Sequence, residues 1–327
     1  MTTLLSGGTG TPKLLSDLMP NSEITVIGNT GDDIEMGDLL ICPDLDTIMY
    51  LSAGVLNKDT WWGIEGDTFE THEYLVRSAK EKGWEGAPNF LGRAEQINGR
   101  EIAKWRRFSG EEEFMQIGDM DRSIHMLRSR LIDEGRTLTE ATENLCSLID
   151  ANIRLLPMSD DPVSSILSTN RGEMHFQGFW AGLKGEPEVK DIEYRGSGVA
   201  RATKLVTKAL ENQVIIGPSN PITSVGPILS LKGIKKLLSE TKVVAVSPFI
   251  GDRAFSGPIK KLMSAKGHEA NTAGLMEMYP FVDVFVIDSS DKIETDRKVV
   301  KTDIRINSTE DAKRVYGSCL EALEEIE

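Results

Sequence analysis

The stretch SGGTGTPKLL, residues 6–15, decides the fold, because it joins an apolar run to a helical pattern through three glycines. The run that precedes it, TTLLS at residues 2–6, is typical of a buried strand. Thr11 is predicted to cap the helix, with Pro12 at the first helical position, where a missing N–H is tolerated. A glycine-rich loop between a strand and a helix is common in doubly wound sheets, and it predicts such a sheet here.

The same loop suits an anion. Gly7, Gly8 and Gly10 permit positive φ angles and leave the backbone N–H groups uncovered. Lys13 lies in the first helical turn, where the helix dipole disfavours a cation unless an anion is bound. The pattern favours phosphate binding by residues 8–13, although a plain tight turn has the same composition. It matches neither G-x-x-x-x-G-K-[ST] nor G-x-G-x-x-G, so neither common nucleotide motif applies.

Further apolar runs alternate with helical patterns along the whole chain. The predicted strands lie at residues 2–6, 23–28, 152–159, 212–219, 242–249 and 282–288. The predicted helices lie at residues 12–18, 44–56, 120–134, 138–150, 199–211, 231–239, 271–279 and 310–326. This alternation predicts a mainly parallel sheet wrapped by helices, in a single Rossmann-like α/β domain over residues 1–327.

Two segments depart from the alternation. Residues 163–195 contain two extended runs around TNRG, which predicts a small antiparallel hairpin at one edge. Residues 59–136 are charged and punctuated by glycine, and we interpret them as a mostly helical insertion in the domain. The role of residues 78–112 within it is left open. Directly after it, Thr137 and Glu140 have the spacing of a capping box.

Composition limits the classes of function. Acidic residues outnumber basic ones by 51 to 37, and the net charge of −14 disfavours binding to nucleic acid and to anionic membranes. The three cysteines, Cys42, Cys146 and Cys319, have no metal-site spacing and are odd in number. No targeting segment or long apolar stretch is apparent. We therefore expect a cytoplasmic protein without nucleic-acid or membrane partners.

Polar side chains follow the second predicted strand. Asn29 suits a nucleotide, and Asp32 and Asp33 suit a divalent cation or a ribose, although N-T-G-D-D is also ordinary turn chemistry. Asp44 and Asp46 then occupy the first turn of a helix, where negative charge is favourable. They are about 200° apart around the helix axis, so we expect one to cap the helix and the other to face the cleft.

Three later segments repeat this placement of polar groups. Asp119 and Asp121 begin a helix, and Asp160 follows a strand. A proline-bracketed loop supplies Ser219, Asn220, Thr223 and Ser224, whose hydroxyl and amide groups suit a base or ribose. Because the carboxyl ends of parallel strands lie at one edge of a sheet, these loops are expected to converge on one site.

The motifs together resemble a known family. SGGTGTPKLL, PDLDT, WWGIE, GDMD, LPMSDDPV, IGPSNPITSVGPI and AVSPFIG followed by SGPIKKLM occur in this order over about residues 3–290. In this they resemble the 2-phospho-L-lactate transferases, a family that builds the deazaflavin coenzyme F-420. The GNTGDD stretch and the long insertion between WWGIE and GDMD depart from the family pattern.

The resemblance implies a transferase of substituted phosphate groups. A 2-phospholactyl group, or its phosphoenolpyruvyl counterpart, would move from a guanosine diphosphate adduct to 7,8-didemethyl-8-hydroxy-5-deazariboflavin, giving coenzyme F-420-0 and GMP. A backbone loop, a lysine and Mg²⁺ suit the charge that develops on the phosphoryl oxygens. The family also implies a homodimer. The sequence does not decide which three-carbon acid the donor carries.

The resemblance also assigns residues to roles. Asp46 would contact the deazaflavin and orient or deprotonate the attacking hydroxyl, and Gln116 would be a second deazaflavin contact. Trp62 suits stacking on the ring, although a Trp61–Trp62 pair also packs without a ligand. The nucleotide would be held by Gly8, Thr9, Gly10, Thr11, Lys13, Asn29, Ser219, Asn220, Thr223 and Ser224. Mg²⁺ would be held by carboxylates from Asp44, Asp46, Asp119 and Asp160.

Two other functions would share part of this pattern. A regulatory protein that binds a nucleotide sugar, from the same superfamily, would share the glycine loop, but PDLDT and LPMSDDPV argue against it. A nicotinamide dehydrogenase needs a G-x-G-x-x-G turn, which is missing from the sequence. The four histidines have no ligand spacing, and His125 is interpreted as an ordinary mid-helix residue.

Overall fold

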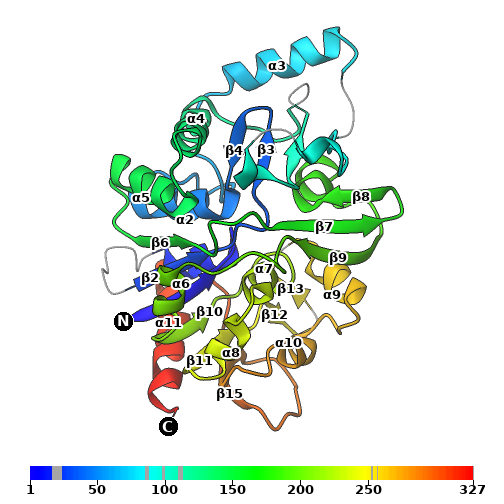
Figure 1. The fold of residues 1–327 in the computed structure, drawn as a ribbon. Helices are drawn as coiled ribbons and strands as arrows, with labels where there is room; N and C mark the ends of the chain where they lie inside the picture. Colours follow the sequence, from blue (N-terminus) through cyan, green and yellow to red (C-terminus); the bar gives the residue numbers. More distant parts are fainter. Residues whose placement is uncertain are drawn as a thin grey trace.

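The computed structural model describes residues 1–16, 24–84, 88–97, 100–109, 113–251, 253–255 and 257–326. Seven strands form one sheet in the order β15-β14-β11-β10-β1-β2-β6, and every neighbouring pair is parallel (Figure 1). They are β1 (Thr2–Ser6), β2 (Ile24–Gly28), β6 (Arg154–Pro157), β10 (Gln213–Ile216), β11 (Val243–Val246), β14 (Val284–Asp288) and β15 (Lys298–Thr302). The predicted α/β class with a mainly parallel sheet is confirmed.

Both faces of this sheet are covered, which is why its central strands are buried along nearly their whole length and are rich in apolar residues. Leu4 and Leu5 of β1 point to opposite faces and belong to separate hydrophobic cores. The first core includes residues of α1 (Gly10–Leu15), α2 (Pro43–Ala53), α4 (Asp119–Asp133), α5 (Leu138–Leu148) and α11 (Thr309–Glu324). The second includes residues of α6 (Lys204–Ala209), α7 (Val225–Ser230), α8 (Ile234–Leu238) and α10 (Thr272–Met278). The sheet is therefore doubly wound, as predicted.

The predicted hairpin is part of a three-stranded antiparallel sheet. Its order is β8-β7-β9, with β7 (Ser164–Thr169), β8 (Gly172–His175) and β9 (Val189–Arg195). A π-helical turn (Gly178–Gly182) follows β8, and α9 (Ile259–Ala265) shares a third core with this sheet. The short strands β12 (Phe249–Ile250) and β13 (Arg253–Ala254) pair separately. This layer stands beside the carboxyl ends of the main sheet (Figure 1).

The insertion at residues 59–136 contains α3 (Glu70–Glu81), most of which is exposed, and it ends on α4. Between these helices lie 3-10 turns at Glu95–Ile97 and Glu101–Ala103, and β5 (Arg107–Phe108). β5 pairs with β3 (Ile34–Met36), and β3 pairs with β4 (Leu39–Ile41). In Figure 1, α3 projects from the top of the molecule, away from the main sheet. These three strands were not anticipated, because each is two or three residues long.

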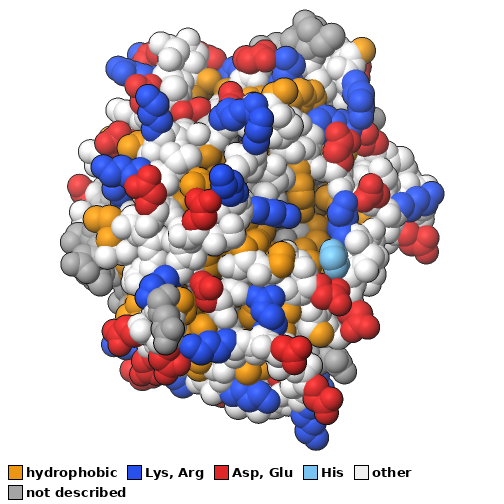
Figure 2. All heavy atoms as spheres, turned by 60° about the horizontal axis from the view of Figure 1, so that its bottom comes forward, with side chains coloured by type: hydrophobic (Ala, Val, Ile, Leu, Met, Phe, Trp, Pro, Cys, Tyr) orange, Lys and Arg blue, Asp and Glu red, His pale blue; other side chains and the backbone are white. Residues whose placement is uncertain are grey.

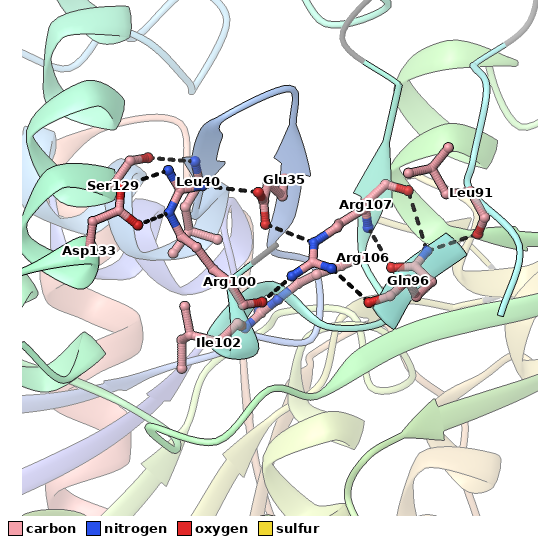
Figure 3. Close-up of polar contacts among 10 residues, drawn as sticks. All are labelled: Glu35, Leu40, Leu91, Gln96, Arg100, Ile102, Arg106, Arg107, Ser129 and Asp133. Atoms are coloured by element: carbon pink, nitrogen blue, oxygen red, sulfur yellow. Dashed lines mark hydrogen bonds and ion pairs between the residues drawn. The ribbon is translucent and has the colours of Figure 1, made fainter. Parts of the chain in front are cut away.

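A buried ionic network fastens the insertion to the body of the protein (Figure 3). Glu35 of β3 accepts hydrogen bonds from Arg100 Nη1 at 2.9 Å and from Arg107 Nε at 3.2 Å. Arg100 Nε also donates to Asp133 Oδ1 of α4 at 2.7 Å. Arg107 Nη1 donates to the Gln96 carbonyl at 2.6 Å. One carboxylate thus ties two points of the insertion to the strand that follows the Asn29 loop.

Helix ends test several sequence predictions. Thr137 and Glu140 form the predicted capping box of α5. The prediction that Thr11 caps the first helix is wrong, because α1 begins two residues earlier than predicted, at Gly10, with Thr9 in the cap position. Residues 17–18 of that predicted helix lie outside the described residues. Strand β15 was missed, because it lies at the edge of the sheet and its sequence, KVVKT, is only partly apolar and partly buried.

Charge on the surface is mixed. On the face drawn in Figure 2, basic and acidic side chains are interspersed over most of the surface. This face therefore carries side chains of both signs, although the net charge of the whole chain is −14. Within the described ranges, no helix combines the length and apolar character needed to cross a membrane.

Candidate active site

A cavity of about 730 Å³ opens beyond the carboxyl ends of β1, β2 and β10. Strand β1 lies between the other two, so the loops that follow all three meet at the position where ligands bind in open α/β sheets. The floor is formed by residues after these strands and on α2: Gly8, Thr9, Gly10, Asp32, Pro43, Asp44, Asp46, Thr47, Tyr50, Ser219, Asn220, Thr223 and Ser224. The remaining walls come from the insertion and from the segment after β8.

The glycine loop is packed tightly against the loop that carries Ser219. The Ser219 hydroxyl oxygen accepts hydrogen bonds from Gly7 N at 3.3 Å and Thr11 N at 3.1 Å. A Cβ added at Gly10 would lie 2.0 Å from the Pro218 carbonyl oxygen, and one at Gly8 would lie 2.4 Å from a carboxylate oxygen of α2. None of the three loop glycines has a positive φ. The sequence interpretation is corrected: they are required for close packing, not for a left-handed turn.

Lys13 lies beside the cavity rather than in its lining. Its ammonium nitrogen is 5.1 Å from the centroid of the Trp61 ring, and partial burial lowers the pKa of Lys13. Trp61 does line the cavity, and its backbone has a left-handed φ of 60°. The cation and the ring therefore form one contact between the glycine loop's helix and the insertion.

Two buried carboxylates lie close together at the floor. Asn29 Nδ2 donates to Asp44 Oδ2 at 2.8 Å, and the same nitrogen donates to the Thr223 carbonyl at 3.0 Å. Burial raises the pKa of Asp44 to about 7, although the hydrogen bond from Asn29 opposes the shift. Burial, and then the negative charge of Asp44, raise the pKa of Asp32. Within the described part of the chain, Asp32 Oδ1 has no hydrogen-bond partner.

Asp46 is held by a different group. Arg128 of α4 donates from Nη1 to Asp46 Oδ2 at 3.2 Å and from Nη2 to Asp46 Oδ1. His125 Nδ1 lies 3.5 Å from Asp46 Oδ2, and His125 Nε2 lies 3.3 Å from Asp121 Oδ1. Tyr50 donates its hydroxyl hydrogen to Asp121 at 2.6 Å. All five side chains are buried, so a fixed array of hydrogen bonds surrounds Asp46.

Asp44 and Asp46 both line the cavity, although they are two residues apart on α2. Neither side chain caps the helix. The prediction that one caps and only the other faces the cleft is therefore wrong. Asn29 holds the first carboxylate and Arg128 holds the second, so separate partners bring the two side chains to one space.

Most of the predicted site residues lie together. Those that line the cavity are Gly8, Thr9, Gly10, Asp44, Asp46, Trp62, Gln116, Ser219, Asn220, Thr223 and Ser224. Thr11 and Asn29 are fully buried behind this lining, where they hold the loops in place.

Asp119 and Asp160 lie elsewhere, because each serves a helix end. Asp119 accepts hydrogen bonds from the Thr68 hydroxyl at 2.6 Å and from Glu70 N at 3.0 Å, at the start of α3. The first of these is the main cause of the lowered pKa of Asp119. Asp160 accepts from Thr139 N at 2.8 Å at the start of α5. Neither carboxylate is available to the cavity.

Sequence reasoning missed Tyr50 and Arg128, and it treated His125 as an ordinary helical residue. One local signal was present: Asp121, His125 and Arg128 follow one another at spacings of four and three, which places them on one face of α4. The contact between this face and Asp46, which lies 82 positions before Arg128, depends on the tertiary structure and cannot be read from local spacing.

The other half of the cavity is aromatic. Trp61 and Trp62 come from the start of the insertion, Phe114 from the segment just before α4, and Phe176 and Trp180 from the segment after β8. Apolar faces of this kind suit a flat ring system. The cavity thus combines a polar floor, rich in carboxylate, hydroxyl and backbone groups, with an aromatic upper half.

A model of the family described as 2-phospho-L-lactate transferase CofD matches residues 2–320. The chain belongs to this family. Curated proteins named 2-phospho-L-lactate transferase include one from Haloarcula marismortui, 52% identical and covering 100% of both chains. Another, from Halobacterium salinarum, is 49% identical over 99% of this chain and 98% of its own length. One from Methanosarcina acetivorans is 45% identical over 89% of this chain and 87% of its own. This protein is a transferase enzyme.

A solved structure shares the fold. A UPF0052 family protein from Bacillus halodurans superposes with a TM-score of 0.57, at 14% identity, over 96% of this chain and 98% of its own. At that identity the likeness supports the doubly wound architecture only.

Proposed function

We propose that the protein moves a 2-phospholactyl or phosphoenolpyruvyl group from a guanosine diphosphate adduct to 7,8-didemethyl-8-hydroxy-5-deazariboflavin, giving coenzyme F-420-0 and GMP. The observation that carries this proposal is the two-part cavity, whose polar floor suits a diphosphate and whose aromatic half suits a flat acceptor. The names of the curated relatives support the same chemistry.

The donor half is built from backbone and hydroxyl groups. Gly8, Thr9 and Gly10 line it on one side, and Ser219 and Asn220 on the other. Backbone N–H groups without covering side chains suit phosphoryl oxygens, and hydroxyl and amide groups suit a ribose and a base. The packing of the two loops holds these groups in place before the donor binds, which favours a fixed diphosphate geometry.

The reaction requires an acceptor hydroxyl to attack the phosphorus that carries the three-carbon acid. The new O–P bond forms, the bridging P–O bond breaks, and GMP leaves with the electron pair. Asp46 lines the cavity and accepts hydrogen bonds from Arg128, so its carboxylate is ionised and oriented. In this proposal Asp46 orients the attacking hydroxyl and accepts its proton.

A divalent cation fits the floor at Asp32 and Asp44. Both carboxylates are buried, they interact through their charges, and Asp32 Oδ1 lacks a partner among the described residues. Hard cations such as Mg²⁺ prefer oxygen ligands of this kind. Asp46 fits less well because Arg128 already occupies both of its oxygens. When bound, Mg²⁺ would neutralise charge that develops on the phosphoryl group.

The test is mass spectrometry of the products after the protein is mixed with Mg²⁺, the deazariboflavin acceptor, and the phospholactyl or the phosphoenolpyruvyl donor in separate reactions. The expected result is a deazaflavin phosphodiester and GMP from one donor. Asp46→Asn should abolish turnover while GDP still binds. The matched control is Asp191→Asn, on β9, whose carboxylate faces Lys266. Absence of product with both donors, together with tight binding of a nucleotide sugar, would support the regulatory function instead.

The proposal extends to assembly and location. A homodimer in the cytoplasm, without nucleic-acid or membrane partners, agrees with the family and with the acidic composition. Light scattering during gel filtration tests the dimer, and a mass of one chain would contradict it.

A further inference from the structure

Three side chains of the insertion form a chain of polar contacts at the edge of the cavity. Glu113 Oε2 lies 2.8 Å from Nδ1 of His72, a residue of α3. The same carboxylate is 2.7 Å through Oε1 from Nη2 of Arg122, a residue of α4. The side chains are 16%, 7% and 12% exposed in the order His72, Glu113, Arg122. His72 and Glu113 line the cavity, and Arg122 lies behind them.

The contacts fix which nitrogen of His72 faces the ligand space. Arg122 Nη2 also approaches Glu113 Oε2, at 2.8 Å, so Glu113 is an ionised carboxylate that only accepts hydrogen bonds. His72 Nδ1 must therefore carry the hydrogen in this contact. That leaves Nε2 as the second nitrogen of the ring, and it has no hydrogen-bond partner among the described residues. This nitrogen accepts a hydrogen bond in the neutral ring and donates one in the charged ring.

His72 is not needed to hold α3 in place. The first turn of α3 is already anchored by Asp119, which accepts from Glu70 N at 3.0 Å and from Thr71 N at 3.1 Å. The Thr68 hydroxyl bonds to the same carboxylate at 2.6 Å. A purely structural histidine would add little to this anchor. A histidine whose tautomer is fixed by a buried carboxylate, and whose second nitrogen is left open beside a cavity, is instead suited to a ligand.

The surroundings of His72 indicate which ligand. The aromatic half of the cavity contains Trp62, Phe114 and Trp180 along with His72, whereas the groups suited to a diphosphate lie on the floor. A flat ring that lies against the aromatic side chains presents its polar groups at its edge. Because the reacting hydroxyl must reach Asp46 on the floor, the ring belongs on the side of the insertion.

We infer that His72 is a specificity residue for the acceptor, and that its Nε2 forms a hydrogen bond with an acidic O–H or imide N–H at the edge of the acceptor ring. The inference rests on the proposed function, since it assumes a ring-bearing acceptor. Glu113 is the positioning residue, and Arg122 keeps Glu113 charged. The three-carbon acid and the nucleotide do not take part in this contact.

The variant that tests this contact most directly is His72→Asn. Its side-chain amide retains a donor for Glu113 at the position of Nδ1 and has no atom in place of Nε2. The Michaelis constant for the deazaflavin acceptor should rise about tenfold, the effect of losing one hydrogen bond in a closed site. The Michaelis constant for the donor and the turnover number should stay within about twofold, because the contact is remote from the phosphorus. His72→Gln, which extends an amide toward the Nε2 position, should recover part of the loss.

A spectroscopic measurement separates ligand contact from folding. The absorbance of the bound acceptor, followed as a function of pH, should show a shifted ionisation of its acidic ring group in the native protein. That shift should shrink in His72→Asn. The matched control is His268→Gln, since His268 Nδ1 also faces a carboxylate, Glu277 at 3.8 Å, but lies outside the cavity. Melting curves of all variants establish that each is folded.

The outcomes separate this inference from the proposed function. Native protein that makes no product from the deazaflavin acceptor contradicts the proposed function and removes the basis of this inference. Native protein that is active, with an unchanged acceptor Michaelis constant in folded His72→Asn, overturns the role of His72 alone. A rise in the Michaelis constant of the donor instead of the acceptor also overturns it. If His72→Asn does not fold, the comparison is made with His72→Ala, which also has no atom in place of Nε2.

Discussion

Arg128 of α4 bonds to both carboxylate oxygens of Asp46 on α2, and both side chains are buried. This pair joins the first catalytic candidate to the far end of the insertion. Because the charges are buried, each is compensated mainly by the other, so removal of one leaves the other unpaired. The orientation of the Asp46 side chain therefore depends on α4, which is part of the insertion.

Arg128→Met should lower the free energy of unfolding by about 3–5 kcal/mol, since it leaves the Asp46 carboxylate buried without its partner. Chemical denaturation measures this loss. The double variant Arg128→Met with Asp46→Asn should be more stable than Arg128→Met, because it removes the unpaired charge. A single variant that loses less than about 1 kcal/mol would show that solvent or another group compensates Asp46.

Gly10→Ala should disrupt the floor of the cavity. Its Cβ would lie 2.0 Å from the Pro218 carbonyl oxygen, so backbone must move, at a cost of about 1–3 kcal/mol. We also expect GDP binding, measured by calorimetry, to weaken at least about tenfold. The control is Gly198→Ala, where nothing lies within 4 Å of the added Cβ. Equal binding by both variants would show that the two loops separate without affecting the nucleotide.

The pKa of Asp44 predicts a pH dependence of stability. Burial raises it from 3.8 to about 7, so the folded protein holds this proton more tightly than the unfolded chain does. The contribution of Asp44 to stability is therefore fully present at low pH and is lost as the pH rises toward about 7. The melting temperature of native protein relative to Asp44→Asn should fall between about pH 4 and pH 7 and change little above that range. The opposite slope would contradict the assignment.

Mg²⁺ should reverse this loss, because a cation binds the deprotonated carboxylates at the floor. Its affinity, measured by calorimetry without substrates, should rise as the pH passes through about 7, the pKa of Asp44. Asp44→Asn and Asp32→Asn should each weaken binding. Asp119→Asn should not, since Asp119 lies outside the cavity. Binding that is equally weakened by Asp119→Asn would place the cation elsewhere.

Glu35→Gln should loosen the insertion without unfolding the central sheet. The neutral side chain loses the ionic part of its contacts with Arg100 and Arg107, and two buried guanidinium groups are left undercompensated. Hydrogen exchange should become faster in residues 100–109 and stay unchanged in β1 and β10. Glu101→Gln is the control, because its 81% exposed side chain pairs with Lys104 at the surface. Faster exchange in β1 would indicate global destabilisation instead.

The main sheet is predictable from sequence because both of its faces are buried. Strands such as VVAV in β11 are continuous apolar runs, the pattern expected of a strand that is buried on both faces of a sheet. Strand β15 and the short strands β3, β4 and β5 are not predictable in this way. β15 is an edge strand with mixed side chains, and β3, β4 and β5 are only two or three residues long, so neither periodicity nor composition marks them.

The site is predictable to the extent that it follows from the sheet. Loops after β1 and β10 meet because these strands are neighbours, so the glycine loop and the Ser219 loop could be placed in one site. The sequence could not separate the aspartates that line the cavity from those that serve a helix end, because both kinds occupy the same position at the start of a helix. Asp44 and Asp119 each occupy the first turn of a helix, and only their tertiary partners distinguish them.

The position of β1 between β2 and β10 has a consequence for the order of assembly. Thr2 pairs with Ile24 on one side and with Gln213 on the other. The backbone groups on the first edge of β1 can therefore form hydrogen bonds with β2 soon after synthesis begins, whereas those on the second edge wait until β10 has been made. Until then that edge presents unpaired backbone groups that are prone to pairing with other chains. Contacts over such long separations also slow folding. During synthesis, the part of the cavity between the glycine loop and the Ser219 loop is thus completed late.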